Sequence, residues 1–165
     1  MVRKGIRTVT LTGVLFALIL IVQALGLPYV VAGPLVNAVL LLATVFVGVG
    51  GGVLIGLLTP WVALLRGILP APLGPIVPFI MLGNAVFVTV FGLFRRKGEF
   101  FFAIGGVVLG AFAKYLVLSQ AVRLLIDLPP PVARMMQVPQ LITALLGETI
   151  ALFLSQALQR VHVGE

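Results

Sequence analysis

Long apolar blocks with charged residues confined to their ends are the feature of this sequence that most restricts its fold. Of the 165 residues, 61% are hydrophobic and 9% are charged, and the mean hydropathy is +1.28. A soluble domain of this size needs a far more polar surface. Each block is instead long enough to cross a hydrocarbon core of about 30 Å as a helix. The sequence therefore predicts an all-α membrane protein with one membrane domain over residues 1–165.

The second apolar block, Leu35 to Leu65, is too long for one crossing. As a single helix it would extend roughly 46 Å at about 1.5 Å per residue. A cluster of four glycines within residues 48–52 predicts a tight reversal between two short helices at its middle. Splitting this block gives a bundle of six transmembrane helices, expected at residues 8–26, 35–49, 51–66, 75–94, 100–126 and 132–158.

Basic residues predict how the spans are oriented. Residues 95–97 are Arg, Arg and Lys, and three further basic residues lie within residues 3–7. Loops rich in Lys and Arg stay in the cytoplasm, so an even number of spans must separate these two clusters. The second block must then count twice, and both the N- and C-termini are expected to be cytoplasmic. A five-span arrangement is the alternative. The apolar stretch of the first block is too long for a cleaved signal peptide.

Several kinds of chemistry are disfavoured by composition. The net charge of +7 comes from residues at the ends of apolar blocks, which indicates topology and not a nucleic-acid surface. Without cysteine there are no disulfides and no thiol nucleophiles. The one histidine, His162, lies near the C-terminus, and no HExxH motif or nucleotide-binding loop is present. We expect no catalytic site, so the protein is not expected to be an enzyme, and we expect no metal and no cofactor.

A few polar side chains interrupt the predicted spans. Such residues are costly in lipid and usually face the bundle interior. Lys114 and Glu148 are the ionisable groups deep in these spans; they either neutralise each other, or Lys114 receives an anionic or carbonyl group of a ligand in an outer cavity. Asn84 suits ligand binding or bonding between helices. Trp61 suits an interfacial anchor or a stacking surface.

Small residues and prolines mark two further features. Gly13 and Ala17 are four residues apart, so they share one helix face and permit close approach of another helix, either within the bundle or from a partner. Prolines gather in the three connections predicted to lie outside, where they either form an ordered lid or simply terminate helices.

Six short segments carry a resemblance to a known family. They are LTGVLFA from residue 11, GPLVN from 33, GLLTP from 56, PFIMLGN from 78, AKY from 113, and PQLIT from 139, which is followed by Gly147. Over essentially its whole length the chain resembles an S-component, the substrate-binding membrane subunit of energy-coupling factor (ECF) transporters, which import vitamins and related micronutrients in prokaryotes.

This resemblance implies six helices around one ligand pocket near the outer surface, and a complex with a transmembrane coupling subunit and two ATPase subunits. It implies that Gly13 and Ala17 stand where the family has two alanines that contact the coupling subunit, with glycine in the first place. By position it implies a set of ligand contacts, with the last two behind the others: Asn84, Lys114, Gln120, Gln140, Thr143, Trp61 and Asn37.

The expected function is high-affinity binding of a vitamin or related micronutrient by a multi-pass protein of the cell membrane, with transport driven by the partner ATPases. We expect a small, partly polar ligand whose carboxylate or carbonyl meets Lys114 or Arg66, with Glu148 deeper and structural. A small structural or assembly subunit without a ligand pocket is the competing hypothesis. The two differ in one feature, a cavity of several hundred Å³ lined by Lys114, Asn84 and Gln140.

Overall fold

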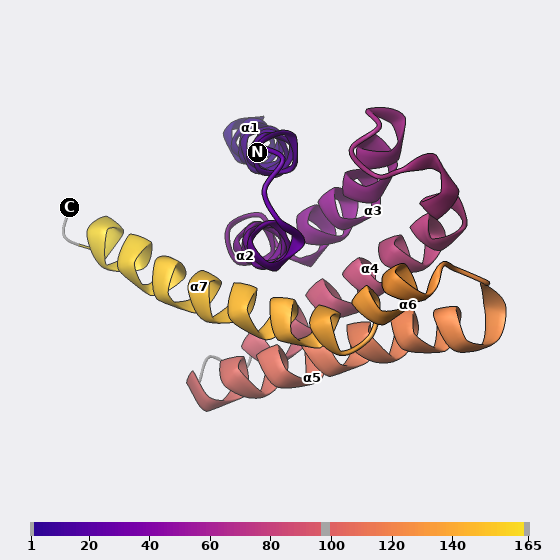
Figure 1. Cartoon of the computed structure of the whole chain (residues 1–165). Coiled ribbons are helices and arrows are strands. Elements are labelled where there is room, and N and C mark those ends of the chain that lie inside the picture. Colours follow the sequence, from indigo (N-terminus) through magenta and orange to yellow (C-terminus); the bar gives the residue numbers. More distant parts are fainter. Residues whose placement is uncertain (1, 97–99, 164–165) are drawn as a thin grey trace.

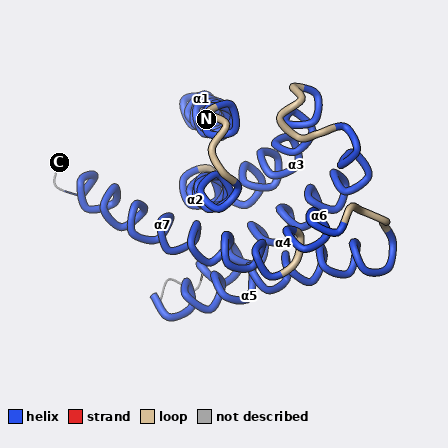
Figure 2. Tube along the Cα trace, viewed as in Figure 1, coloured by secondary structure: helices blue, strands red, loops and turns tan. Residues whose placement is uncertain are grey.

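Helices joined by short connections make up the computed structural model, which describes residues 2–96 and 100–163 (Figure 1). Figure 2 shows no strand in this part of the chain. The helices are α1 (Val2–Ala24), α2 (Tyr29–Phe46), α3 (Val49–Leu65), α4 (Val77–Arg95), α5 (Phe100–Gln120), α6 (Pro130–Met135) and α7 (Val138–Val163), with a 3-10 turn η1 (Ala71–Ile76) before α4 and a π turn η2 (Ala121–Leu125) after α5.

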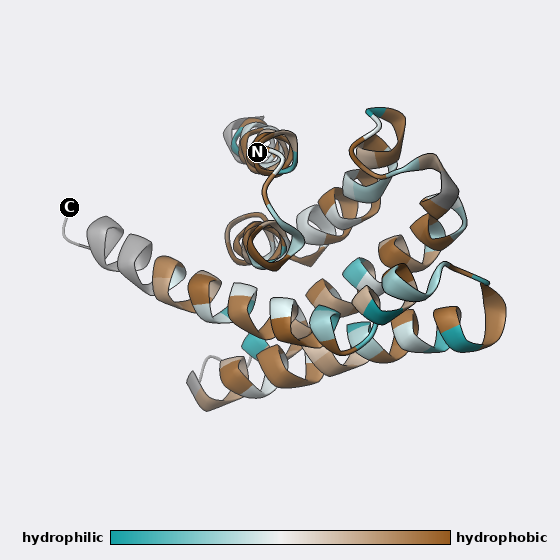
Figure 3. Ribbon diagram, in the orientation of Figure 1, coloured by the Kyte–Doolittle hydropathy of each residue, from teal (hydrophilic) through white to brown (hydrophobic). Residues whose placement is uncertain are grey.

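The expected all-α membrane bundle is confirmed. Among the described residues, five helical segments are long and apolar enough to cross a membrane, and α3 is a shorter apolar helix of 17 residues. Figure 3 shows hydrophobic colour on much of the long helices, with hydrophilic residues at scattered positions. The chain is therefore a multi-pass membrane protein.

The second apolar block divides at the start of its glycine cluster. Between α2 and α3 lies Gly48, whose φ of 99° falls in the left-handed region that favours glycine. α2 begins at Tyr29 and not at the expected Leu35, because Pro34 lies inside the helix and does not start it. A proline removes one backbone hydrogen bond, and a membrane helix tolerates that loss when neighbouring helices cover the site.

The last apolar block is not the single expected helix over 132–158. The short helix α6 ends at Met135, and α7 begins at Val138. Pro139 is the second residue of α7, where a missing N–H interrupts no intrahelical bond. α7 therefore starts at an exposed residue, Val138, and its third residue, Gln140, is buried.

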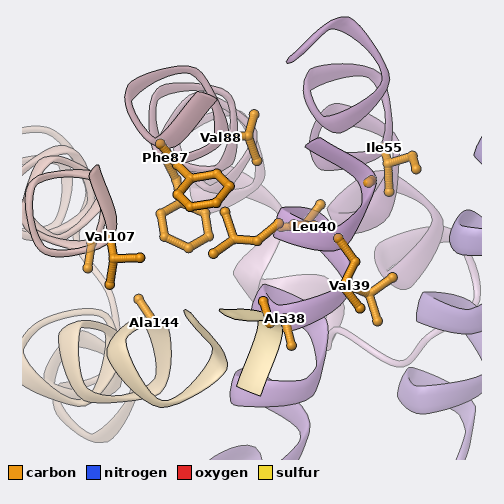
Figure 4. Packing of buried hydrophobic residues seen from close by; sticks show 14 of the residues in the cluster. Ala38, Val39, Leu40, Ile55, Phe87, Val88, Val107 and Ala144 are labelled. Atoms are coloured by element: carbon orange, nitrogen blue, oxygen red, sulfur yellow. The ribbon is translucent and has the colours of Figure 1, made fainter. Parts of the chain in front are cut away.

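The main core lies around α2, as Figure 4 shows. α2 packs against α1, α3, α4 and α7. Its contact with α7 is close because Gly147 has no side chain: a Cβ there would collide with the Pro34 carbonyl oxygen. Helix α1 lies at the periphery of the bundle. One side of it is buried at Ile19 and Val22, and the other side is exposed, as at Val9.

The two ends of the bundle differ in composition. At one end, which we call the basic end, the end of α2 and the start of α3 meet Arg95 and Arg96 of α4. At the other, the proline end, the connections α1 to α2 and α3 to α4 come together around one cavity. A second hydrophobic cluster, Ile76, Ala121, Leu128 and Met136, joins η1 to η2, α6 and their connection.

Candidate functional site

A cavity of about 450 Å³ lies at the proline end. This volume is in the range of small-molecule binding sites. Six helices contribute to its wall, from Gln23 on α1 to Gln140 on α7. Most of the wall is apolar or small, formed by Gly26, Leu27, Ala32, Gly33, Val36, Pro60, Ala63, Ile68, Leu69 and Ile80.

Lys114 provides the only acidic or basic side chain among the described residues of this wall. The residue is 4% exposed. Its Nζ donates a hydrogen bond of 2.7 Å to Asn37 Oδ1 and lies 5.2 Å from the centre of the Phe87 ring. An ammonium group has three donors, so N–H groups remain for a ligand in the cavity. The Asn37 bond and the Phe87 ring hold this ammonium at the wall.

Glu148 is buried away from the cavity. The residue is 0% exposed, and neither carboxylate oxygen has a hydrogen-bond partner. No hydrogen bond therefore joins Lys114 to Glu148. Glu148 Oε1 lies beside Gly110, one helical turn before Lys114, so the two groups are close neighbours in the interior.

Asn84 serves both helix packing and the cavity wall. Its Nδ2 donates a hydrogen bond of 3.0 Å to the Gly56 carbonyl of α3, and Asn84 also lines the cavity. The amide oxygen remains as an acceptor. Gln140 lines the cavity at the start of α7, with a long bond of 3.7 Å from its Nε2 to Met136 Sδ. Thr59, also on the wall, donates to the Ile55 carbonyl.

Three residues expected at the ligand lie elsewhere. Gln120, Trp61 and Arg66 are all exposed and are not part of the cavity wall. The reason is the helix period of about 100° per residue. It turns Trp61 away from the face shared by Thr59 and Ala63, and it turns Gln120 away from the face of Lys114.

Thr143 lies behind the wall. It is 3% exposed, donates a hydrogen bond of 3.1 Å to the Gln140 carbonyl and packs against Gly33. Thr143 therefore supports the residues that line the cavity.

Two polar residues on the wall were not among the expected contacts. Gln23 Oε1 and the Tyr29 hydroxyl are buried and have no partner with hydrogen-bond geometry, although Thr143 lies beside Tyr29. They flank the connection between α1 and α2. A polar residue on each side of Leu27 and Pro28 is the signal in the sequence that points to them.

The outer face of α1 is open. Gly13 and Ala17 are both exposed, and no atom outside the local helix lies within 4 Å of a Cβ placed on Gly13. Ile6 and Val9 extend this face as exposed apolar residues. Another helix can therefore pack closely against this face without a steric clash.

A smaller cavity of about 220 Å³ lies at the basic end, between Thr44, Gly48 and Arg95.

Comparison with family models, with curated proteins and with solved structures gives no match. The fold and the larger cavity together define a multi-pass membrane protein with a ligand-sized cavity among its helices.

Proposed function

We propose that the protein is the substrate-binding S-component of an energy-coupling factor importer for a vitamin or related small micronutrient. The observation that carries this proposal is the cavity of about 450 Å³ with Lys114, Asn84 and Gln140 on its wall. These three side chains come from three different helices, and they converge on one space that is otherwise apolar. Such an arrangement is typical of a small-molecule site.

The competing hypothesis, a structural or assembly subunit, explains the cavity less well. A subunit that uses polar residues only for helix packing has no need of an ammonium group on the wall of a space this large. Burial of that group is costly in a membrane protein, and an unfilled space beside it forfeits packing contacts. A bound ligand accounts for both features.

Transport by this protein would depend on partners. In the proposed arrangement the proline end faces outward, and the coupling subunit docks on the exposed face of α1 at Gly13 and Ala17. Their small size and exposure support a close helix contact there. Two ATPase subunits would supply the energy, and the location would be the cell membrane.

Native mass spectrometry of the protein in lipid nanodiscs tests the proposal. We expect a small molecule to co-purify with the unmodified protein, to be lost from Lys114→Ala, and to be retained by Gln120→Ala. Gln120 is the matched control because it lies on the same helix and is exposed outside the cavity. Equal retention by both variants would remove Lys114 from the site. An empty unmodified protein would favour the assembly subunit.

A further inference from the structure

Residues that carry unsatisfied polar groups line two separate parts of the cavity wall. Near its floor, Lys114 Nζ is bonded to Asn37 and keeps N–H donors free, since neither oxygen of Glu148 accepts from it. Near the connection of α1 and α2, Gln23 Oε1 and the Tyr29 hydroxyl are buried and have no partner with hydrogen-bond geometry, with Thr143 beside Tyr29. A buried polar atom without a partner is costly, so groups of this kind on a cavity wall indicate what a ligand has to supply.

The helix geometry gives the separation of these two parts. Tyr29 and Asn37 are eight residues apart on α2, which corresponds to about 12 Å along the helix axis. The wall between them is formed by Ala32, Gly33 and Val36 of α2, and Pro60 of α3 faces the same space. A ligand that reaches both parts therefore needs an apolar or neutral middle.

The two parts differ in the ligand groups that they accept. The floor presents a formal positive charge and N–H donors, and no Asp or Glu belongs to the described wall. An anionic oxygen fits this part, and one cation matches one negative charge. The other part presents an amide oxygen and a phenol. A ligand hydroxyl group can donate to the amide oxygen, and it can donate to or accept from the phenol. A ligand amino group can donate to both.

We propose that the ligand is a small monocarboxylate with a hydroxyl or amino group at its far end, the carboxylate against Lys114 and the far end between Gln23 and Tyr29. This proposal rests on the proposed function and specifies its substrate class. Cations are disfavoured because they would meet Lys114. Polyanions are disfavoured because the wall has one basic side chain, and pure hydrocarbons because they leave the polar atoms at both ends unpaired.

Four matched probes test this assignment on the intact protein in nanodiscs: ω-hydroxyhexanoate, hexanoate, the methyl ester of ω-hydroxyhexanoate, and ω-aminohexanol. Binding is measured as the rise in melting temperature over a concentration series into the millimolar range. We expect ω-hydroxyhexanoate to bind most tightly. Loss of the terminal hydroxyl or of the negative charge should each weaken binding about tenfold, and the cation should not bind.

Two variants separate the two ends of the ligand. In Lys114→Gln the preference for the acid over its ester should disappear while the preference for the hydroxyl remains. In the double variant Gln23→Leu, Tyr29→Phe the reverse should hold, and Gln120→Leu should change neither preference. Tyr29→Phe alone removes a single oxygen atom, so it serves if the double variant does not fold.

The outcomes also separate this inference from the proposed function. Equal binding of ester and acid, or preferred binding of the cation, would overturn the substrate class, as would failure of all four probes to bind. A co-purified molecule without a carboxyl group would do the same and would leave the binding-subunit function intact. The absence of any co-purified molecule counts against that function itself.

Discussion

At the scale of single residues, the bond between Lys114 and Asn37 is the polar interaction on which the cavity depends most. The ammonium group is buried, and it donates a hydrogen bond to Asn37 Oδ1. A buried charge is tolerated only where partners replace its hydration. Asn37 therefore holds Lys114 at the wall whether or not a ligand is present.

Replacement of Asn37 should expose this dependence. We expect Asn37→Ala to lower the free energy of unfolding by about 1.5 to 3 kcal/mol, the usual range for a hydrogen bond to a charged group. In the double variant with Lys114→Met the loss should be smaller than the sum of the single losses, because no unpaired charge remains. Denaturant unfolding in mixed micelles measures all three. Additive losses would show that the bond contributes nothing of its own.

The same residues show what a sequence reveals at this scale. Lys114, Asn84, Gln140 and Asn37 were predicted at the site because polar groups in membrane spans face inward, and all four lie on the cavity wall. Their ligand contacts stay predictions. Which face of a helix turns inward depends on its rotation in the bundle, and this could not be read for Trp61, whose exposure fits an interfacial anchor better than a contact on the cavity wall.

At the scale of the elements, the close contact between α2 and α7 depends on the missing side chain of Gly147. A Cβ at this residue would meet the Pro34 carbonyl oxygen, the Asn37 Cβ and the Ala38 nitrogen. These atoms belong to the backbone or lie directly next to it, so they cannot move aside without a shift of a helix. Because Asn37 belongs to this contact, a displaced α2 would also disturb the wall of the cavity.

Gly147→Ala should therefore destabilise the protein. We expect a loss of about 1 to 3 kcal/mol, as for other overpacked sites, together with weaker ligand binding. Gly13→Ala is the matched control: it meets no neighbour, and alanine in a helix interior should raise stability by about 0.5 to 1 kcal/mol. Melting temperatures in detergent compare the two. A Gly147→Ala protein as stable as its parent would mean that α2 and α7 pack less closely than described.

The element boundaries were predictable where backbone chemistry dominates. Glycine at a positive φ is a local requirement, so the break at Gly48 could be read from the sequence. The start of α2 and the division between α6 and α7 could not. Proline lowers the helix preference of a segment, but whether the chain stops there depends on the cover that neighbouring helices give to the freed backbone groups.

At the scale of the whole molecule, the open face of α1 leads to a prediction about assembly. Gly13 is exposed and a Cβ placed on it meets no neighbour, so Gly13→Leu should leave the free energy of unfolding within about 0.5 kcal/mol of the parent. It should nevertheless weaken co-purification with a co-expressed coupling subunit, because it blocks close helix approach. Gly50→Leu is the control, an exposed glycine on α3, away from the α1 face, where a Cβ also meets no neighbour. Equal complex recovery from both variants would exclude Gly13 from the interface.

The same scale includes the question whether α3 crosses the membrane on its own. With 17 residues it extends about 25 Å, somewhat less than a hydrocarbon core of about 30 Å. A helix this short crosses when the bilayer thins around it or when its neighbours cover it. α3 packs against α1, α2 and α4, so it has this cover. The prediction that both termini are cytoplasmic depends on this crossing, since without it the bundle has five spans.

Cysteine labelling decides between the two arrangements, and the chain has no cysteine of its own to interfere. Gly50 at the start of α3 and Ala71 beyond its end are both exposed, and replacing them with cysteine alters no charge that governs topology. On intact cells, a membrane-impermeant maleimide should label Ala71→Cys at once and Gly50→Cys only after permeabilisation. Labelling of both from the same side would mean that α3 does not cross, whereas the inverse pattern would place the proline end and its cavity in the cytoplasm.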